Sequence, residues 1–332
     1  TKCFHRFLNW LFSKETQQDM PGHGRTFRRQ IADFWQIWPM PPKIETSRDV
    51  VFVDGIYLAK KACVLICYDG EHVLGWYLCR SEQSRSWQSL MQRIATPIVV
   101  VSDGGPGLRK ALKKVWRTAK LQRCIVHAVW QVHRYTTRRP KTLAGIMLKD
   151  LASDLYSVKT QEDAQIWIQR LFNWRVTFKE FLSEMTRDSN DNLRATHERL
   201  LKAYNSLVVL INTETMFRYL DETLVLDKEC PRTNNPIEGG VNAQLRRLLR
   251  YHRGMSVEKR IKAVFWWCYL HSPRPLSAKE ILKVMPTDAS ISKIYRSMNE
   301  RAQLQGIIPT WGDAISWGDL HNYDKLSFND WD

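Results

Sequence analysis

The spacing of hydrophobic residues predicts a mixed α/β segment over residues 46–128. Strands are expected where Val, Ile, Cys and Tyr gather, at 50–58, 62–68, 73–78, 97–101 and 121–126. Asp69 and Gly70 favour a tight turn between the second and third strands, because both tolerate the positive φ that such a turn requires. Helical spacing predicts helices over 84–94 and 108–115. The element order is therefore β-β-β-α-β-α-β, which is typical of a compact α/β core.

After residue 128 the strand pattern fades and hydrophobic residues recur at helical spacing. One amphipathic stripe extends from Ala164 to Met185, and a second extends from Leu193 to Ile211. We therefore expect an all-helical insertion over residues 129–232. A further helix is expected to begin at Pro236, and another is expected over 257–270.

The N-terminal residues 1–45 contain short apolar segments separated by Pro and Gly, which predicts one or two short helices. The basic pair Arg28 and Arg29 fits the start of a DNA-reading helix, and an ordinary amphipathic helix explains it equally well. The chain thus divides into five segments. They are a partial N-terminal DNA-binding segment with a helix-turn-helix remnant (1–45), the first part of an α/β core (46–128), the helical insertion (129–232), the second part of the core (233–285) and a C-terminal tail (286–332).

Charge favours a polyanionic partner. The chain has 50 Lys and Arg against 34 Asp and Glu, a formal net charge of +16, and such an excess points to nucleic acid. Every charged residue from 104 to 141 is basic, including Lys113 and Lys114, and a second basic cluster contains Arg246, Arg247 and Arg250. We expect these side chains to contact phosphates; the alternative for each is a solvated surface.

Two classes of protein are disfavoured. The longest apolar stretch, 50–68, is interrupted by charged residues, so no membrane span is expected. The seven cysteines are scattered, without a Cys-x-x-Cys pair, which argues against a disulfide framework and favours a reducing compartment.

Three carboxylates are candidates for chemistry. Asp54 interrupts an apolar strand, Asp103 closes another, and Glu238 follows Asn235-Pro236 at the start of a helix. Each has a structural alternative, which is a turn or cap for either Asp and a capping box for Glu238. Together the three carboxylates supply the hard oxygen ligands that bind a pair of Mg²⁺ ions in phosphodiester chemistry.

Four motifs resemble those of a known family. They are Val53-Asp54-Gly55, Ser102-Asp103-Gly104, Cys124-Ile125-Val126-His127 and Asn234-Asn235-Pro236-Ile237-Glu238. In order and spacing the chain resembles the DDE transposases of bacterial insertion sequences in the Mutator-like superfamily. The resemblance implies an RNase H-like mixed sheet interrupted by an all-helical insertion, with Asp54, Asp103 and Glu238 as catalytic metal ligands. It also implies two Mg²⁺ ions, for which Mn²⁺ can substitute, and cleavage of element ends followed by strand transfer to target DNA.

The same resemblance implies further roles. Cys124 and His127 match the Cys-x-x-His motif of the family, although two ligands do not make a zinc site. Trp130 and Trp174 lie where related transposases stack a DNA base, with core packing as the favoured alternative. The implied partners are double-stranded DNA, as terminal inverted repeats and target, and further copies of the chain in a homodimer or larger assembly. The implied location is the bacterial cytoplasm, in association with the nucleoid.

Two other functions remain open at this stage. The first is a truncated or domesticated DNA-binding regulator of transposition without catalytic activity. The second is a structure-selective nuclease that cleaves without joining.

Overall fold

The computed structural model describes residues 1–59 and 62–304, and the chain forms two compact units. Of the described residues, unit 1 comprises 1–59, 62–97, 105–117 and 235–304, and unit 2 comprises Ile98–Gly104 and Thr118–Asn234. Of the tail expected over 286–332, residues 305–332 lie outside the described part. Among the described residues, no helix combines the length and apolar character needed to cross a membrane.

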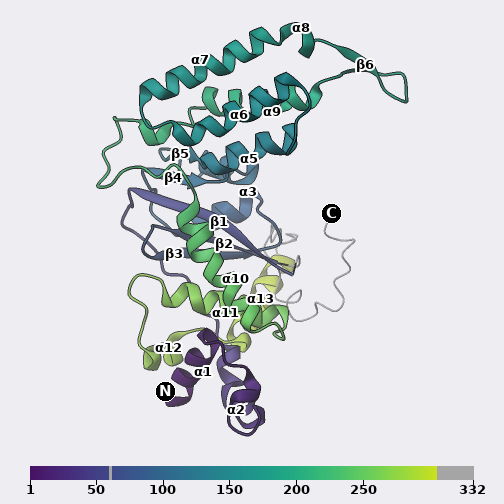
Figure 1. The fold of residues 1–332 in the computed structure, drawn as a ribbon. Helices are drawn as coiled ribbons and strands as arrows, with labels where there is room; N and C mark the ends of the chain where they lie inside the picture. Colours follow the sequence, from purple (N-terminus) through teal and green to yellow (C-terminus); the bar gives the residue numbers. More distant parts are fainter. Residues whose placement is uncertain (60–61, 305–332) are drawn as a thin grey trace. The chain divides into compact units, whose positions relative to one another are not determined.

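Unit 1 contains an antiparallel group of three strands, and the predicted strands are confirmed there (Figure 1). The strands are β1 (Val50–Leu58), β2 (Ala62–Tyr68) and β3 (Val73–Cys79), with β2 in the middle. Asp54 on β1 pairs with Ile66 on β2. The turn before β3 is fixed by Asp69, whose Oδ1 accepts hydrogen bonds from the backbone N–H groups of Glu71 and His72.

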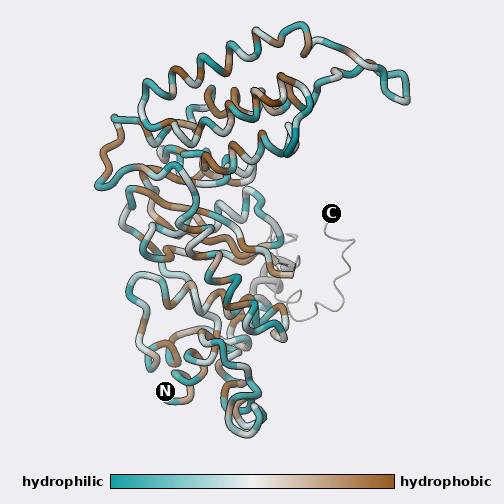
Figure 2. The backbone as a smooth tube through the Cα atoms, viewed as in Figure 1, coloured by the Kyte–Doolittle hydropathy of each residue, from teal (hydrophilic) through white to brown (hydrophobic). Residues whose placement is uncertain are grey.

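The helices of unit 1 differ in how far they are buried. In helix α11 (Val257–Leu270) every residue from 261 to 269 is buried, and all of these except Lys262 are apolar or aromatic, as expected for an inner helix. It packs against β1 and β3. Figure 2 shows hydrophobic residues gathered along β1–β3. Further helices of this unit are α3 (Ser84–Met91), α4 (Pro106–Leu112), α12 (Ala278–Val284) and α13 (Asp288–Leu304).

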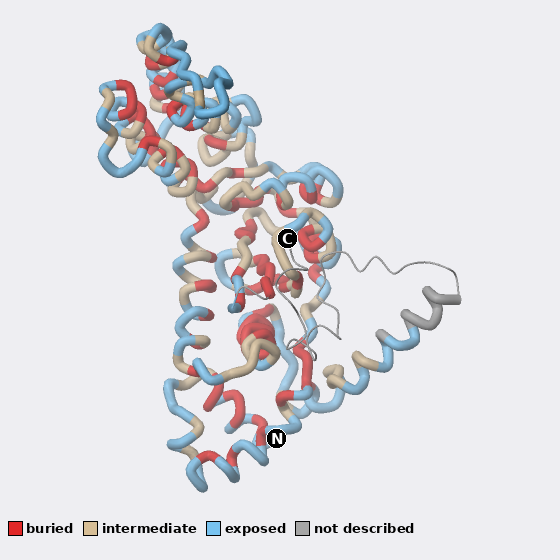
Figure 3. The backbone as a smooth tube through the Cα atoms, turned by 90° about the vertical axis from the view of Figure 1, so that its right-hand side faces the viewer, coloured by how far each residue is buried: buried red, intermediate tan, exposed pale blue. Residues whose placement is uncertain are grey.

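The N-terminal segment is helical, as predicted, and it shares the core of unit 1. Its elements are α1 (Lys2–Phe12), η1 (Gln17–Asp19), α2 (Arg25–Ile31) and η2 (Asp33–Gln36). Phe4 of α1 lies edge-on to Trp266 of α11 at a centroid distance of 5.4 Å. Trp10 packs in the same way on Phe27 of α2, at 5.4 Å. These aromatic contacts attach a segment that is too short to bury a core of its own. In contrast, those residues of α13 whose burial is described are exposed or half-buried (Figure 3).

Unit 2 combines a parallel pair of strands with helices. Strands β4 (Val99–Ser102) and β5 (Lys120–Arg123) pair in parallel. The helices are α5 (Ile125–Thr136), α6 (Leu143–Asp154), η3 (Leu155–Ser157), α7 (Gln161–Thr177), α8 (Lys179–Leu182), α9 (Glu198–Asn212) and η4 (Arg218–Leu220). Their apolar stripes meet in one core that includes Trp167, Trp174 and Leu207.

The expectation of an all-helical insertion is wrong at one place. Strands β6 (Met185–Arg187) and β7 (Leu193–Ala195) form a two-stranded hairpin that extends beyond α8 (Figure 1). Oδ1 of Asp188 accepts hydrogen bonds from the N–H groups of Asn190 and Asn192, and Asp191 has a φ of +62°. Such hydrogen bonds from side chain to backbone compete with helix formation. The first predicted amphipathic stripe therefore ends before this turn, and the second begins after it.

The helix expected at Pro236 is confirmed, but it begins irregularly. Residues Pro236–Asn242 form a π-helical stretch, η5, and continue as α10 (Ala243–Tyr251). A Cβ atom on Gly239 would lie 2.5 Å from Oδ1 of Asn235, so the Asn235 side chain would have to move if residue 239 carried a side chain. In class, the protein is mixed α/β with both antiparallel and parallel strand pairs, as predicted.

Candidate functional site

Asp54 is held at both carboxylate oxygens. Its Oδ1 accepts a hydrogen bond from the N–H of Gly55 at 2.9 Å, and its Oδ2 accepts one from Nδ2 of Asn242 at 2.7 Å. Asp54 is half-buried in the middle of β1. A carboxylate in a strand is disfavoured unless its charge is solvated by donors, and here two donors fix its orientation.

Gly55 has a structural reason to follow Asp54. A Cβ atom at residue 55 would lie 2.7 Å from Oε1 of Glu82 and 3.0 Å from Sγ of Cys63. Only Gly therefore lets the Glu82 carboxylate approach this part of β1. Glu82 was not among the residues that the sequence singled out, because nothing in the pattern around it differs from an ordinary loop before a helix.

Glu238 lies on η5 in the same unit as Asp54. The capping interpretation of Glu238 is wrong, because Asn235 has helical φ and ψ angles and makes no side-chain cap hydrogen bond. Glu238 is half-buried. Since η5 packs against β1, the fold of unit 1 brings the element that carries Glu238 to the strand that carries Asp54.

Asp103 lies in unit 2, directly after β4, and is half-buried. The turn that follows is built by its neighbours, since Oγ of Ser102 accepts the N–H of Gly104 at 3.0 Å. Gly104 has a φ of +80°, a left-handed conformation that favours Gly. The Ser102-Asp103-Gly104 motif is thus a tight turn that presents a carboxylate at the end of a buried strand.

Cys124 and His127 occupy the first turn of α5. The Cys124 thiol is buried and accepts hydrogen bonds from His127 and, at 3.3 Å, from the N–H of Asn234. Burial raises the pKa of this thiol, but the hydrogen bonds from His127 and Asn234 outweigh it, so the net pKa is lowered. Within unit 2 the motif therefore ties the start of α5 to the end of the segment before residue 235.

The two candidate stacking residues differ in exposure. Trp130 on α5 is 58% exposed, and its ring lies edge-on to His127 at 5.5 Å. Trp174 is 3% exposed, donates from Nε1 to the carbonyl of Ala144 and stacks on Tyr204. The base-stacking hypothesis for Trp174 is therefore wrong, and the core packing that the sequence favoured is its role. For Trp130, stacking stays a prediction.

The Lys and Arg residues predicted to bind DNA all lie in unit 1, and all of them are exposed. These residues are Arg28, Arg29, Lys113, Lys114, Arg246, Arg247 and Arg250. On α10 the buried face is formed by Leu245 and Leu248, so the three arginines occupy the opposite face. Their contact with phosphates stays a prediction.

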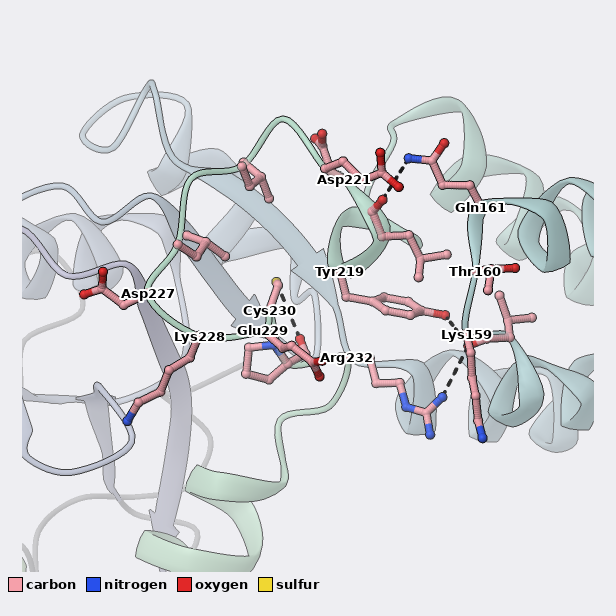
Figure 4. A pocket seen from close by; sticks show the side chains of 16 residues that line it. Lys159, Thr160, Gln161, Tyr219, Asp221, Asp227, Lys228, Glu229, Cys230 and Arg232 are labelled. Atoms are coloured by element: carbon pink, nitrogen blue, oxygen red, sulfur yellow. Dashed lines mark hydrogen bonds between the residues drawn. The ribbon is translucent and has the colours of Figure 1, made fainter.

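A wide, open hollow of about 1000 Å³ lies within unit 2 (Figure 4). Two of its polar residues, Tyr219 and Arg232, form hydrogen bonds that connect η4 and the segment after it to residues 156–158. The guanidinium of Arg232 donates to the carbonyls of Tyr156 and Val158, and the hydroxyl of Tyr219 donates to the same Val158 carbonyl. None of the predicted site residues lines it. We assign this hollow a structural role.

Asn242 is the residue of this site that sequence reasoning missed. The available signal was a polar residue four positions after Glu238, on the side of the helix that carries Ile237 and Val241. The Gly239-Gly240 pair was a second signal, since two glycines are unusual inside a regular helix. Neither signal shows which carboxylate Asn242 contacts.

Comparison with known proteins points to one family. Residues 50–193 match the family described as "Transposase, Mutator family". The transposase for insertion sequence element IS905 of Lactococcus lactis subsp. lactis (strain IL1403) is 24% identical over 184 residues, covering 49% of this chain and 45% of that protein. A probable transposase for an insertion sequence element of Corynebacterium diphtheriae is 25% identical over 146 residues, covering 41% of this chain and 40% of that protein. The chain thus spans less than half the length of these curated relatives.

The family match includes Asp54, Asp103, Cys124 and His127, whereas Glu238 lies beyond its end. The resemblance indicated by the first three motifs is therefore confirmed independently of the Glu238 motif. Over residues 50–193 this chain is similar to the Mutator family of transposases, and it is also similar to two curated transposases of bacterial insertion sequences.

Proposed function

We propose that this chain is a DDE-type DNA transposase in which Asp54, Asp103 and Glu238 bind two Mg²⁺ ions. The observation that carries the proposal is the Asp54 carboxylate. It is fixed on β1 by a residue of η5, and η5 is the element that carries Glu238. The family match over residues 50–193 supports the same function.

The donor set fits the proposed metal. Mg²⁺ prefers hard oxygen ligands, and the three side chains offer carboxylates. Paired Mg²⁺ ions, or Mn²⁺ in their place, would activate the attacking oxygen and stabilise the leaving oxygen of a phosphodiester. Asp54 contributes a preorganised ligand, because Gly55 and Asn242 hold both of its oxygens.

The strand groups fit the corresponding fold. An RNase H-like core requires three antiparallel strands and a parallel pair, and the two units supply these respectively. In such a core, Asp54 on β1 and Asp103 directly after β4 would form one site together with Glu238 on η5. We therefore propose the RNase H-like fold together with the function.

The proposed substrate is double-stranded DNA, as the inverted repeats at the element ends and as the target. Water would attack the phosphodiester at the element end, which breaks the P–O bond and releases a 3′-hydroxyl. That hydroxyl would then attack a target phosphodiester and displace the target 3′-oxygen. The exposed arginines of α10 are placed to bind phosphates, and Trp130 is exposed enough to stack a base. We also propose assembly of two or more copies on DNA in the bacterial cytoplasm.

Strand cleavage and joining test this function. The probe is a labelled duplex carrying the repeats that flank the coding sequence, incubated with Mg²⁺ and the full chain. Asp103→Asn should abolish both products, whereas Asp150→Asn, a matched change at an exposed position of α6, should abolish neither.

The products separate the alternatives. Binding of the duplex without cleavage by the wild type would contradict the proposal and favour a non-catalytic regulator. Cleavage without joining would favour a structure-selective nuclease.

A further inference from the structure

We propose that Asn242 is a positioning residue that orients Asp54 for metal binding. This inference rests on the proposed function, since it assigns a role within the same site. Asn242 is fully buried, and its Nδ2 lies 2.7 Å from Oδ2 of Asp54. No comparison or motif points to this residue.

Two hydrogen bonds restrict the orientation of the Asp54 carboxylate. The Gly55 N–H and the Asn242 amide each bind a different oxygen, at 2.9 and 2.7 Å, so the carboxylate plane is fixed. A carboxylate oxygen has more than one lone pair, so an oxygen that accepts one hydrogen bond can also bind a cation. Outer partners that hold a metal ligand in this way commonly contribute a factor of 10–100 to metal affinity.

The chemistry of the side chain favours this role over simple packing. Only a donor can face the negatively charged Oδ2, so an amide is suitable and a carboxylate at 242 is not. The other end of the amide, Oδ1, is buried and has no hydrogen-bond partner among the described residues. A buried acceptor without a donor is unfavourable, and a bound cation or water molecule would satisfy it.

The position of Asn242 on η5 supports the same conclusion. Residues four apart on a helix lie on one face, so Glu238 and Asn242 share a face of this stretch. Asn242 contacts β1 directly. One short helical stretch therefore carries a proposed metal ligand and the group that orients another ligand.

Direct metal binding by the full chain tests the inference. The probe is Mn²⁺ alone, titrated by electron paramagnetic resonance, and the variant is Asn242→Leu, which keeps the volume and removes the donor. We expect Mn²⁺ to bind about 10-fold more weakly, with a thermal unfolding midpoint within a few degrees of the wild type. The DNA reaction should require a correspondingly higher Mg²⁺ concentration for half-maximal rate and recover at saturating Mg²⁺.

Two further variants make the test decisive. Asn242→Ser is small enough to fold if Leu is not tolerated, and its hydroxyl is too short to replace the amide, so the same weakening is expected. Thr136→Val removes a buried hydrogen bond in unit 2 and should leave Mn²⁺ affinity unchanged.

The outcomes separate this inference from the proposed function. Unchanged Mn²⁺ affinity in folded Asn242 variants would overturn the positioning role, even if the wild type is an active transposase. Weakened affinity in a chain that never cleaves DNA would support the positioning role and contradict the transposase. A wild type that binds no Mn²⁺ would overturn both.

Discussion

The Nζ atom of Lys262 lies 2.6 Å from Oδ1 of Asp288, and this fully buried ammonium joins α11 to the start of α13. The same Nζ donates to Oε1 of Glu258 and to the carbonyl of Trp35, and it lies 4.6 Å from the ring centroid of Trp38. One lysine thus connects the N-terminal segment, the inner helix and the C-terminal helix of unit 1.

Replacing Lys262 should destabilise unit 1. In Lys262→Met the half-buried carboxylates of Glu258 and Asp288 lose the cation that pairs with both of them. Loss of one partner of a buried ion pair costs about 3–5 kcal/mol, and partial exposure of the two carboxylates favours the lower end. Urea denaturation measures the change. Lys279→Met, at an exposed position of α12, is the control, and an equal effect of both variants would contradict the prediction.

Stability should fall as the pH decreases below about 6.5, the ordinary pKa of histidine. His252 is buried, which lowers its pKa, and its contact with the Leu11 carbonyl only partly opposes this effect. In this range the unfolded chain binds more protons than the folded chain, so the free energy of unfolding decreases as the pH falls through the lowered pKa. Unfolding curves between pH 7.5 and 5 measure the slope.

His252→Gln should reduce that slope without abolishing it, because burial also lowers the pKa of His133. The matched control is His5→Gln at an exposed position of α1, which should keep the slope of the wild type. A slope that His252→Gln leaves unchanged would refute this assignment.

Gly104→Ala should weaken both stability and cleavage. The φ of +80° is unfavourable for Ala, and the new Cβ would lie 2.6 Å from Nη1 of Arg123, which must move. We expect a loss of about 1–2 kcal/mol and slower cleavage, since the turn that presents Asp103 is displaced. Gly254→Ala, where an added Cβ has nothing within 4 Å, should change neither quantity. Wild-type cleavage by Gly104→Ala would argue against a catalytic Asp103.

Replacement by alanine should affect stability at Trp174 and DNA binding at Trp130. Trp174→Ala removes a ring from the core of unit 2 and should destabilise the protein by about 3–5 kcal/mol. Trp130→Ala removes an exposed ring and should change stability by less than about 0.5 kcal/mol. If Trp130 stacks a base, its loss should weaken DNA binding by about 1–3 kcal/mol, measured by fluorescence anisotropy. Equal DNA affinity of wild type and Trp130→Ala would exclude stacking.

The strands β1 and β2 were predicted well because the residue types that favour a strand lie within each strand itself. Runs such as 50–58 and 62–68 are rich in apolar residues that include Val, Ile, Cys and Tyr, and β1 and β2 begin and end where expected. The hairpin of β6 and β7 was missed because its strands are three residues long. So short an element has no periodicity that distinguishes it from a helix end, and the competing signal from Asp188 depends on the turn itself.

By itself, the sequence determined the mixed α/β class, the carboxylates in their motifs and the family resemblance, because each depends on residue type and local spacing. Only the tertiary structure decided which partners these residues have. It buried Trp174 and His252, it placed Asn242 of η5 against Asp54 of β1, and it gathered Trp35, Trp38 and Asp288 around Lys262. Contacts between residues far apart in the chain depend on how whole elements pack, and a local pattern of polar and apolar residues does not carry that information.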